Sequence, residues 1–303
     1  MRKSQIVIGS LATLVLTSWV SSALAETTPA VGTSETQATS VMDKISASFA
    51  TSLYGGPALT DPLSPYAPNV ALGRGNRDES TATFLRSGIG ANYKLSDTLS
   101  VGPTVSFDLK TFSPGEGAAL TLLDPYVKLS HSKLISSGNL SLSGSVRLYA
   151  PVSTASQNAG IITIVRSDQS LNYTISDSRL SLGLNTFIAG SIVKKATISV
   201  PDETGALKSK TLNALTVYAG PNVSYQMTPS LAAVLVAEMG ASRKMGSGLT
   251  DFYTRTDYTN LAPGVSWDIM PGMNFSPALS IPIGQRIALD TTSLYFDFSW
   301  KFL

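Results

Sequence analysis

Charged side chains are the residues of this chain most able to act on a passing solute. They recur at alternate positions inside neutral and apolar segments, and alternate residues of a strand face the same side. The candidates are Arg86, Asp108, Lys110, Asp124, Lys128, Arg147, Arg166, Asp168 and Asp297. Rings of charge select ions by sign, so we expect the three arginines to form a basic wall with Asp108, Asp124 and Asp168 as its counter-charges. The numbers of basic and acidic side chains are nearly equal, which predicts a weak anion preference. If opposite charges paired across the interior of the protein, they would instead close that interior.

The same sequence offers few residues that could catalyse a reaction or bind a metal ion. A hydrolase needs a base beside a nucleophile and a polar group that orients the base, and the one histidine is His131, between Ser130 and Ser132. We place His131 beside a turn on the outer side of its segment, as an interfacial surface residue. One histidine leaves too few ligands for a histidine metal site, and no HExxH, GxSxG, P-loop or EF-hand spacing is present. We therefore expect no enzyme activity, no cofactor and no metal.

Composition and the first residues indicate an exported protein. Arg2 and Lys3, an apolar run from Ile6 to Val20 and the pair Ala23-x-Ala25 are typical of a signal peptide cleaved after residue 25. Its removal takes two basic and no acidic side chains, so 22 Lys and Arg become 20, against 20 Asp and Glu. A neutral mature chain argues against nucleic acid as a partner. Cysteine is absent and charged residues make up 14%, few for a soluble domain.

Beyond residue 25 the pattern predicts a leader and then strands. Residues 26–43 are mostly small and polar, and we expect a flexible periplasmic leader. From residue 44 to 303 apolar and polar residues alternate, which favours strands over helices. About twelve strands are predicted, with 10 or 14 as alternatives. Their ranges are 44–54, 82–94, 98–112, 121–131, 139–152, 161–175, 180–193, 211–226, 230–242, 255–269, 273–283 and 292–302.

The connections alternate between tight turns and long loops. Turn residues stand at Ser96-Asp97, Ser176-Asp177-Ser178, Thr228-Pro229-Ser230 and Pro271-Gly272. Longer stretches fall near 55–80, 113–120, 153–160, 194–210 and 243–254. Short turns on one side and long loops on the other are typical of an up-and-down antiparallel β-barrel in a membrane. A soluble sandwich would show the same alternation with inside and outside exchanged.

The last predicted strand favours the membrane. Phe296, Phe298, Trp300 and Phe302 share one face, whereas Asp297 and Lys301 lie on the other. So aromatic a face is an aggregation hazard in water and is ordinary against lipid. This segment resembles the carboxy-terminal signal of Gram-negative outer-membrane β-barrel proteins, although Leu303 follows the aromatic residue on which that signal usually ends.

The resemblance implies export, insertion by the barrel-assembly machinery and a porin-like activity. Outer-membrane lipid and lipopolysaccharide would be partners, the latter through loop carboxylates such as Asp251, and the barrel would be a monomer or a homo-oligomer. Five prolines take lipid-facing positions in the predicted strands: Pro103, Pro125, Pro221, Pro263 and Pro277. Each could mark a bulge near the rim, or together they could line a lateral groove or an oligomer contact.

Three functions follow from this pattern as hypotheses. The first is a passive channel for small hydrophilic solutes, in which the proline-rich loop 55–80 is a lid or constriction. The second is a structural or lipid-organising membrane protein with a closed barrel, and the third is a transporter of hydrophobic ligands. A barrel of this size lies between filled small barrels and wide porins, so the strand count does not decide among them.

Overall fold

The computed structural model describes residues 41–57, 83–110, 119–201, 207–254, 259–283 and 292–302. The predicted signal peptide, most of the predicted leader and most of the loop 55–80 lie outside these residues. The chain divides into two units, Met1–Asp43 and Lys44–Leu303. A short 3-10 helix, η1 (Val41–Lys44), spans the boundary between the two units in the sequence, and all the described strands belong to the second unit.

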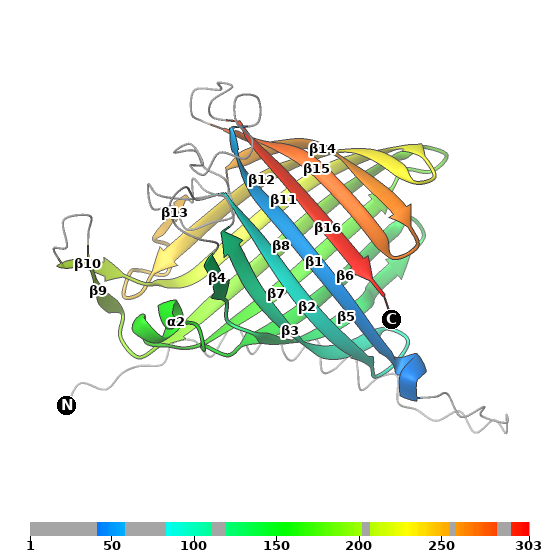
Figure 1. Ribbon diagram of the computed structural model, residues 1–303. Coiled ribbons are helices and arrows are strands. Elements are labelled where there is room, and N and C mark those ends of the chain that lie inside the picture. Colours follow the sequence, from blue (N-terminus) through cyan, green and yellow to red (C-terminus); the bar gives the residue numbers. More distant parts are fainter. Residues whose placement is uncertain are drawn as a thin grey trace. The chain divides into compact units, whose positions relative to one another are not determined.

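The second unit is a closed antiparallel barrel of twelve strands among the described residues (Figure 1). Each strand pairs with the next in chain order, β11 pairs with β12, and β16 pairs with β1 to close the ring. The predicted fold class is therefore confirmed. The wall strands are β1 (Ile45–Pro57), β2 (Phe84–Lys94), β3 (Leu99–Lys110), β5 (Tyr126–Ser137), β6 (Leu140–Tyr149), β7 (Ile161–Thr174), β8 (Leu180–Val193), β11 (Asn213–Thr228), β12 (Leu231–Lys244), β14 (Asn260–Met270), β15 (Met273–Pro282) and β16 (Ser293–Lys301).

A few short elements stand outside the ring. They are β4 (Ala119–Leu122) paired with β3, β13 (Phe252–Thr254) paired with β12, the hairpin β9 (Thr197–Pro201) with β10 (Leu207–Thr211), and the helix α2 (Thr154–Asn158). Among the described residues, no helix has the length and apolar character needed to span a membrane.

The fourth predicted strand, 121–131, is wrong in its bounds. The apolar alternation runs through two separate strands, because β4 ends at Leu122 and β5 begins only at Tyr126. Pro125 lies between them and has no N–H for a ladder; its carbonyl instead accepts a hydrogen bond from the Ala150 N–H at 2.8 Å. As a result β5 continues to Ser137, six residues beyond the predicted end.

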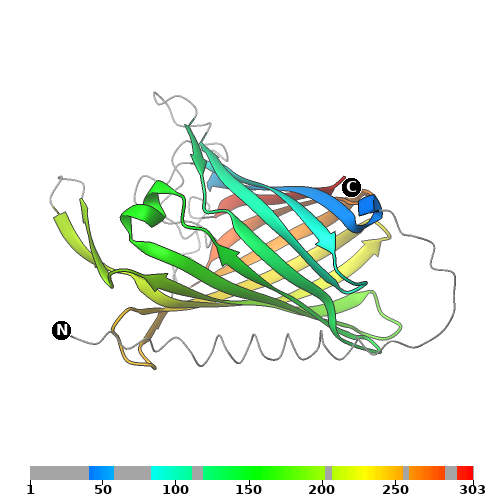
Figure 2. The same ribbon diagram turned by 90° about the horizontal axis from the view of Figure 1, so that it is seen from below.

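The two ends of the barrel differ in their connections (Figures 1 and 2). At one end, here called the turn end, short turns join β2–β3, β5–β6, β7–β8, β11–β12 and β14–β15. Gly138 and Gly272 have φ of 54° and 81° in two of these turns, and Asp177 has φ of 54° in a third. The longer connections, including α2 and the β9–β10 hairpin, all lie at the other end, called the loop end.

The outer and inner faces carry opposite chemistry. Large apolar side chains on the outside are half exposed, such as Val105 at 45%, Val127 at 51% and Leu148 at 55%. Their strand neighbours Asp108, Lys128 and Arg147 point inward and take part in polar contacts. An apolar outside around a polar inside fits lipid and is the reverse of a soluble sandwich.

The wall prolines keep the predicted outward parity. Pro103 pairs with Val127, Pro221 with Leu184, Pro263 with Leu235 and Pro277 with Phe296. All four partners are on the apolar outer face, so the four proline rings lie on that face too. Pro125 lies in the segment before β5 and outside any strand.

Candidate functional site

Three basic side chains stand side by side on adjacent strands inside the barrel. Lys128 on β5 pairs directly with Arg147 on β6, and Arg147 pairs directly with Arg166 on β7. Residues directly opposite in antiparallel strands have Cβ atoms about 4.5–5.5 Å apart. Lys128, Arg147 and Arg166 therefore form a continuous band of positive charge across three strands, which we call the basic row.

One carboxylate serves two members of the basic row. Asp168 Oδ2 lies 2.9 Å from Arg147 Nε, and Asp168 Oδ1 lies 2.6 Å from Arg166 Nη2 and 2.8 Å from Arg166 Nε. Among the described residues, Lys128 forms no ion pair with a carboxylate. The row is therefore under-neutralised, with three basic groups against the single carboxylate that contacts it.

Aromatic rings hold the two arginines in place. The Arg166 guanidinium lies 3.9 Å from the centroid of the Phe187 ring, and Phe187 stacks on Tyr218 with centroids 5.1 Å apart and planes at 10°. Tyr218 Oη in turn donates a hydrogen bond to Glu238 at 3.1 Å. On the other side the Arg147 guanidinium lies 5.1 Å from the Tyr126 ring centroid. Cation–π contacts of this kind fix a guanidinium without cancelling its charge.

Arg86 belongs to a different arrangement. Its Nε and Nη2 donate to the two carboxylate oxygens of Asp108, each at 2.8 Å, which is the bidentate geometry of a strong ion pair. Arg86 also faces Ser52 across β1, and the Ser52 hydroxyl donates to Asp297. Arg86 and Asp108 thus form a neutral pair on β2 and β3. Asp297 on β16 is joined to this region through Ser52 of β1, and all three charged residues lie apart from the basic row.

The remaining predicted residues lie at the loop end. Asp124 accepts hydrogen bonds from the backbone N–H of Ser153 at 2.8 Å and from the Ser156 hydroxyl. Asp124 therefore stabilises the first turn of α2, which lies in the connection between β6 and β7. Lys110 is the last residue of β3 and pairs with Ala119 of β4; its side chain is outside the described part of the structure.

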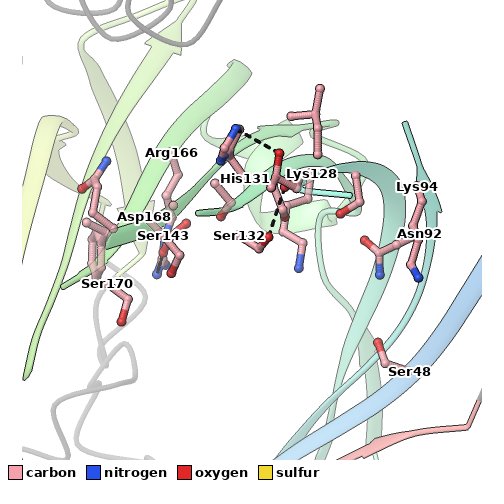
Figure 3. Close-up of a pocket in the computed structure, with 18 of the residues that line it drawn as sticks. Ser48, Asn92, Lys94, Lys128, His131, Ser132, Ser143, Arg166, Asp168 and Ser170 are labelled. Atoms are coloured by element: carbon pink, nitrogen blue, oxygen red, sulfur yellow. Dashed lines mark hydrogen bonds and ion pairs between the residues drawn. The ribbon is translucent and has the colours of Figure 1, made fainter. Parts of the chain in front are cut away.

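A cavity of about 670 Å³ occupies the lumen toward the turn end. The basic row reaches it through Lys128 and Arg166, with Asp168 beside them, and Lys94 and Lys301 line the wall supplied by β2 and β16. Figure 3 shows Asn92, Lys94 and Ser48 on one side of the hollow and Arg166, Asp168, Ser143 and Ser170 on the other. Among its described lining residues, four are basic and two, Asp97 and Asp168, are acidic.

Buried side chains gather toward the loop end. Tyr54, Phe84 and Tyr295 pack there in an aromatic cluster and are 6–8% exposed. Glu238 is buried nearby in the sheet and accepts from Asn260 Nδ2 at 3.4 Å, with Asn260 fully buried. The inward side chains are thus packed near the loop end and open onto a cavity near the turn end.

His131 does not occupy the predicted surface position. It is 8% exposed, its Nδ1 accepts from the Lys133 N–H at 3.3 Å, and its Nε2 lies 3.4 Å from Thr98 Oγ1. The prediction placed it beside a turn, but β5 continues past it and the register with β6 is irregular between His131 and Ile135. His131 pairs directly with Leu99 of β3 and Gly144 of β6 and lines the cavity in the lumen. Among the described residues, no group of His, Asp and Glu side chains could hold a metal ion.

The aromatic partners of the arginines were not predicted. Tyr126 has the same inward parity as Lys128 of its own strand, and Phe187 pairs directly with Asp168 and so shares its inward face. The rule that alternate residues of a strand face the same side, applied to aromatic as well as to charged residues, would have identified Tyr126 and Phe187. The contacts of Tyr126 and Phe187 with the guanidinium groups depend on the strand register.

A closed antiparallel barrel with an apolar outer face and a charged lumen is decisive for the class. This chain folds as a closed β-barrel of the membrane-spanning kind. It matches no protein-family model and no curated protein. Among solved structures it is similar to an outer membrane channel from Pseudomonas putida F1, at 13% identity, with a TM-score of 0.49 and coverage of 90% of this chain and 100% of that one.

Two further structures show a weaker likeness. The NanC porin is 7% identical, with a TM-score of 0.44, over 85% of this chain and 99% of that chain. A mutant of the TodX monoaromatic hydrocarbon channel is 10% identical, with a TM-score of 0.41, over 85% of this chain and 89% of that chain. At these identities the likeness concerns the fold alone.

Proposed function

We propose that this outer-membrane barrel is a passive channel for small hydrophilic solutes and that it prefers anions. The observation that carries the proposal is the basic row, in which Arg147 and Arg166 share the single carboxylate of Asp168 while Lys128 and Arg166 face a cavity in the lumen. Uncompensated charge inside a narrow, low-dielectric wall attracts ions of opposite sign and repels those of the same sign.

Charge elsewhere in the cavity lining supports the same sign of selectivity. Arg86 and Asp108 cancel one another in a bidentate pair and contribute little net field at a distance. The cavity wall adds Lys94 and Lys301 on the far side from the basic row. The preference should be larger than a balanced count of charges in the sequence suggests, because the acidic residues are not spread evenly over the lumen.

A closed, structural barrel is the second candidate, and one observation favours it. Asn260, Ser242, Ser293 and Thr83 are fully buried near the loop end, so the interior is densely packed at that level. In this case the lumen would conduct nothing and the apolar outer wall would organise lipid. The serine-rich wall of the turn-end cavity argues against the third hypothesis, a transporter of hydrophobic ligands.

Conductance distinguishes the two candidates. Purified, folded protein in a planar bilayer with a KCl gradient should give steady pores whose reversal potential shows anion preference. Lys128→Glu should reduce or reverse that preference, because it inverts the one member of the basic row that has no ion pair among the described residues. The matched control is Lys210→Glu, on the exposed β10 strand outside the ring.

The same experiment can reject the proposal. Folded protein that gives no pores in repeated insertions would favour the closed structural barrel. Pores whose reversal potential is the same in wild type and Lys128→Glu would remove the basic row from selectivity.

A further inference from the structure

We propose that the turn-end cavity is a binding site for a small polyhydroxylated anion, a solute that carries a carboxylate or phosphate together with several hydroxyl groups. This inference rests on the proposed channel function and names its solute class. The cavity volume of about 670 Å³ falls inside the range of about 300–1,000 Å³ for small-molecule sites.

The cations of this site surround the cavity. Lys128 and Arg166 project from β5 and β7, whereas Lys94 and Lys301 come from β2 and β16. Figure 3 shows Lys94 across the hollow from Arg166. An anion between the two walls would meet positive charge on both sides, which holds it in place, whereas charge on one wall alone would only attract it.

Neither acidic residue of the lining, Asp97 or Asp168, forms an ion pair with Lys94, Lys128 or Lys301. Both oxygens of Asp168 are engaged by Arg147 and Arg166. Lys94 and Lys301 are exposed, and neither forms an ion pair with a described carboxylate. Their ammonium groups can therefore turn toward a solute without first breaking a contact.

Hydroxyl recognition comes from the rest of the lining. Small polar side chains contributed by five strands line the cavity: Ser46, Ser48, Asn92, Ser130, Ser143 and Ser170. A serine hydroxyl both donates and accepts hydrogen bonds, and an asparagine amide does the same through two atoms. Such a wall matches a solute with several hydroxyl groups, whereas a simple inorganic anion would use only the cations.

Single-channel recording tests the site with defined probes. Gluconate and glucose 6-phosphate, added on the side of the turn end, should interrupt the KCl current of wild-type pores, the first as a carboxylate and the second as a phosphate. Glucose carries the hydroxyl groups without the charge, and acetate carries the charge without the hydroxyl groups. Each should require at least about tenfold higher concentration for the same block, since charge-assisted and neutral contacts both contribute.

Variants on the far wall identify the residues. The double variant Lys94→Gln with Lys301→Gln should raise the half-blocking gluconate concentration about tenfold and leave block by glucose unchanged. Lys210→Gln is the control outside the lumen. If the double variant fails to fold, Lys94→Gln alone should give a smaller shift in the same direction.

The outcomes separate the two proposals. Absence of pores would overturn the channel function itself. Steady, anion-preferring pores that gluconate and glucose 6-phosphate do not interrupt would overturn the binding site and leave the channel intact. Equal block by glucose and gluconate would also overturn it, since the cations would then contribute nothing.

Discussion

At the scale of single residues, selectivity depends on which charges find a partner. Arg86 and Arg147 look alike in the sequence, yet Arg86 has a bidentate partner in Asp108 while Arg147 shares Asp168 with Arg166. A shared carboxylate neutralises at most one of two guanidinium groups. The difference in partners makes one arginine part of a neutral pair and the other part of a basic surface.

Asp168→Asn should increase anion preference. The substitution removes the carboxylate beside the basic row, while the amide oxygen can still accept from the arginines. The anion-to-cation permeability ratio should rise about two- to fivefold, from a Coulomb interaction of about 0.5–1 kcal/mol over roughly 8 Å at an effective dielectric constant of about 40–80. Reversal potentials in a KCl gradient measure the ratio.

The control for this change is Asp251→Asn. Asp251 lies in the connection after β12 and its carboxylate accepts from the Gly248 N–H, outside the ring of strands. A ratio that stays at the wild-type value in Asp168→Asn, or that rises equally in both variants, would contradict local control by the basic row.

At the scale of elements, the spacing between neighbouring strands depends on glycine residues. A Cβ on Gly102 of β3 would lie 1.7 Å from the Ala91 carbonyl oxygen of β2 and 2.8 Å from the Asn92 Cα. Both are backbone atoms, so no side-chain movement can relieve the clash. Glycine here lets β2 and β3 approach closely beneath Lys128, which pairs with Gly102 from β5.

Gly102→Ala should destabilise the barrel. Overpacking in a well-packed region costs about 1–3 kcal/mol and more where backbone must move, and we expect at least the upper part of that range. The temperature at which the folded, faster-migrating band disappears on a semi-native gel should fall clearly. Gly190→Ala is the matched control, because a Cβ there would have its nearest neighbour 3.9 Å away. Equal melting of the two variants would show that β2 and β3 separate without cost.

Element boundaries show where sequence patterns fail. Alternation predicted all the wall strands because lipid and lumen impose a strict period of two on every one of them. The error fell on 121–131, where the apolar run of β4 continues the period of β5 across a break. The break depends on pairing, since β4 adds to β3 outside the ring while β5 belongs to it.

At the scale of the whole molecule, closure depends on β16. Its Phe298 pairs with Thr51 of β1 on one side and with Phe275 of β15 on the other. Phe296 and Phe298 also contact other rings, with Phe296 5.4 Å from Phe275 and Phe298 6.4 Å from Phe49 between centroids. The strand that carries the predicted assembly signal is therefore also the one that seals the barrel.

Trp300→Ser with Phe302→Ser should lower several-fold the amount of protein assembled in the outer membrane. We expect this loss because the barrel-assembly machinery would recognise the altered terminal strand less well. The matched variant is Trp267→Ser with Ile269→Ser on β14. These side chains are 46% and 42% exposed, against 41% and 44% for Trp300 and Phe302, so similar lipid contact is lost. Outer-membrane fractionation measures both. Equal losses would mean that the terminal aromatics act only as lipid-facing surface.

The sequence by itself determined the fold class of this protein and the face on which most strand residues lie, His131 being an exception. Those features follow from local periodicity, turn residues and the aromatic last strand, all of which can be read without knowing any partner. The arrangement of charged residues in the lumen was decided only by the tertiary structure. Whether Arg86, Arg147 and Arg166 act together depends on strand register, and register joins residues far apart in the chain. The strand register produces the sharing of Asp168 by two arginines, the aromatic contacts of those arginines, the burial of His131 and the cavity with cations on two sides. The sequence does not predict these contacts, because a contact between distant strands leaves no periodic signal in either strand.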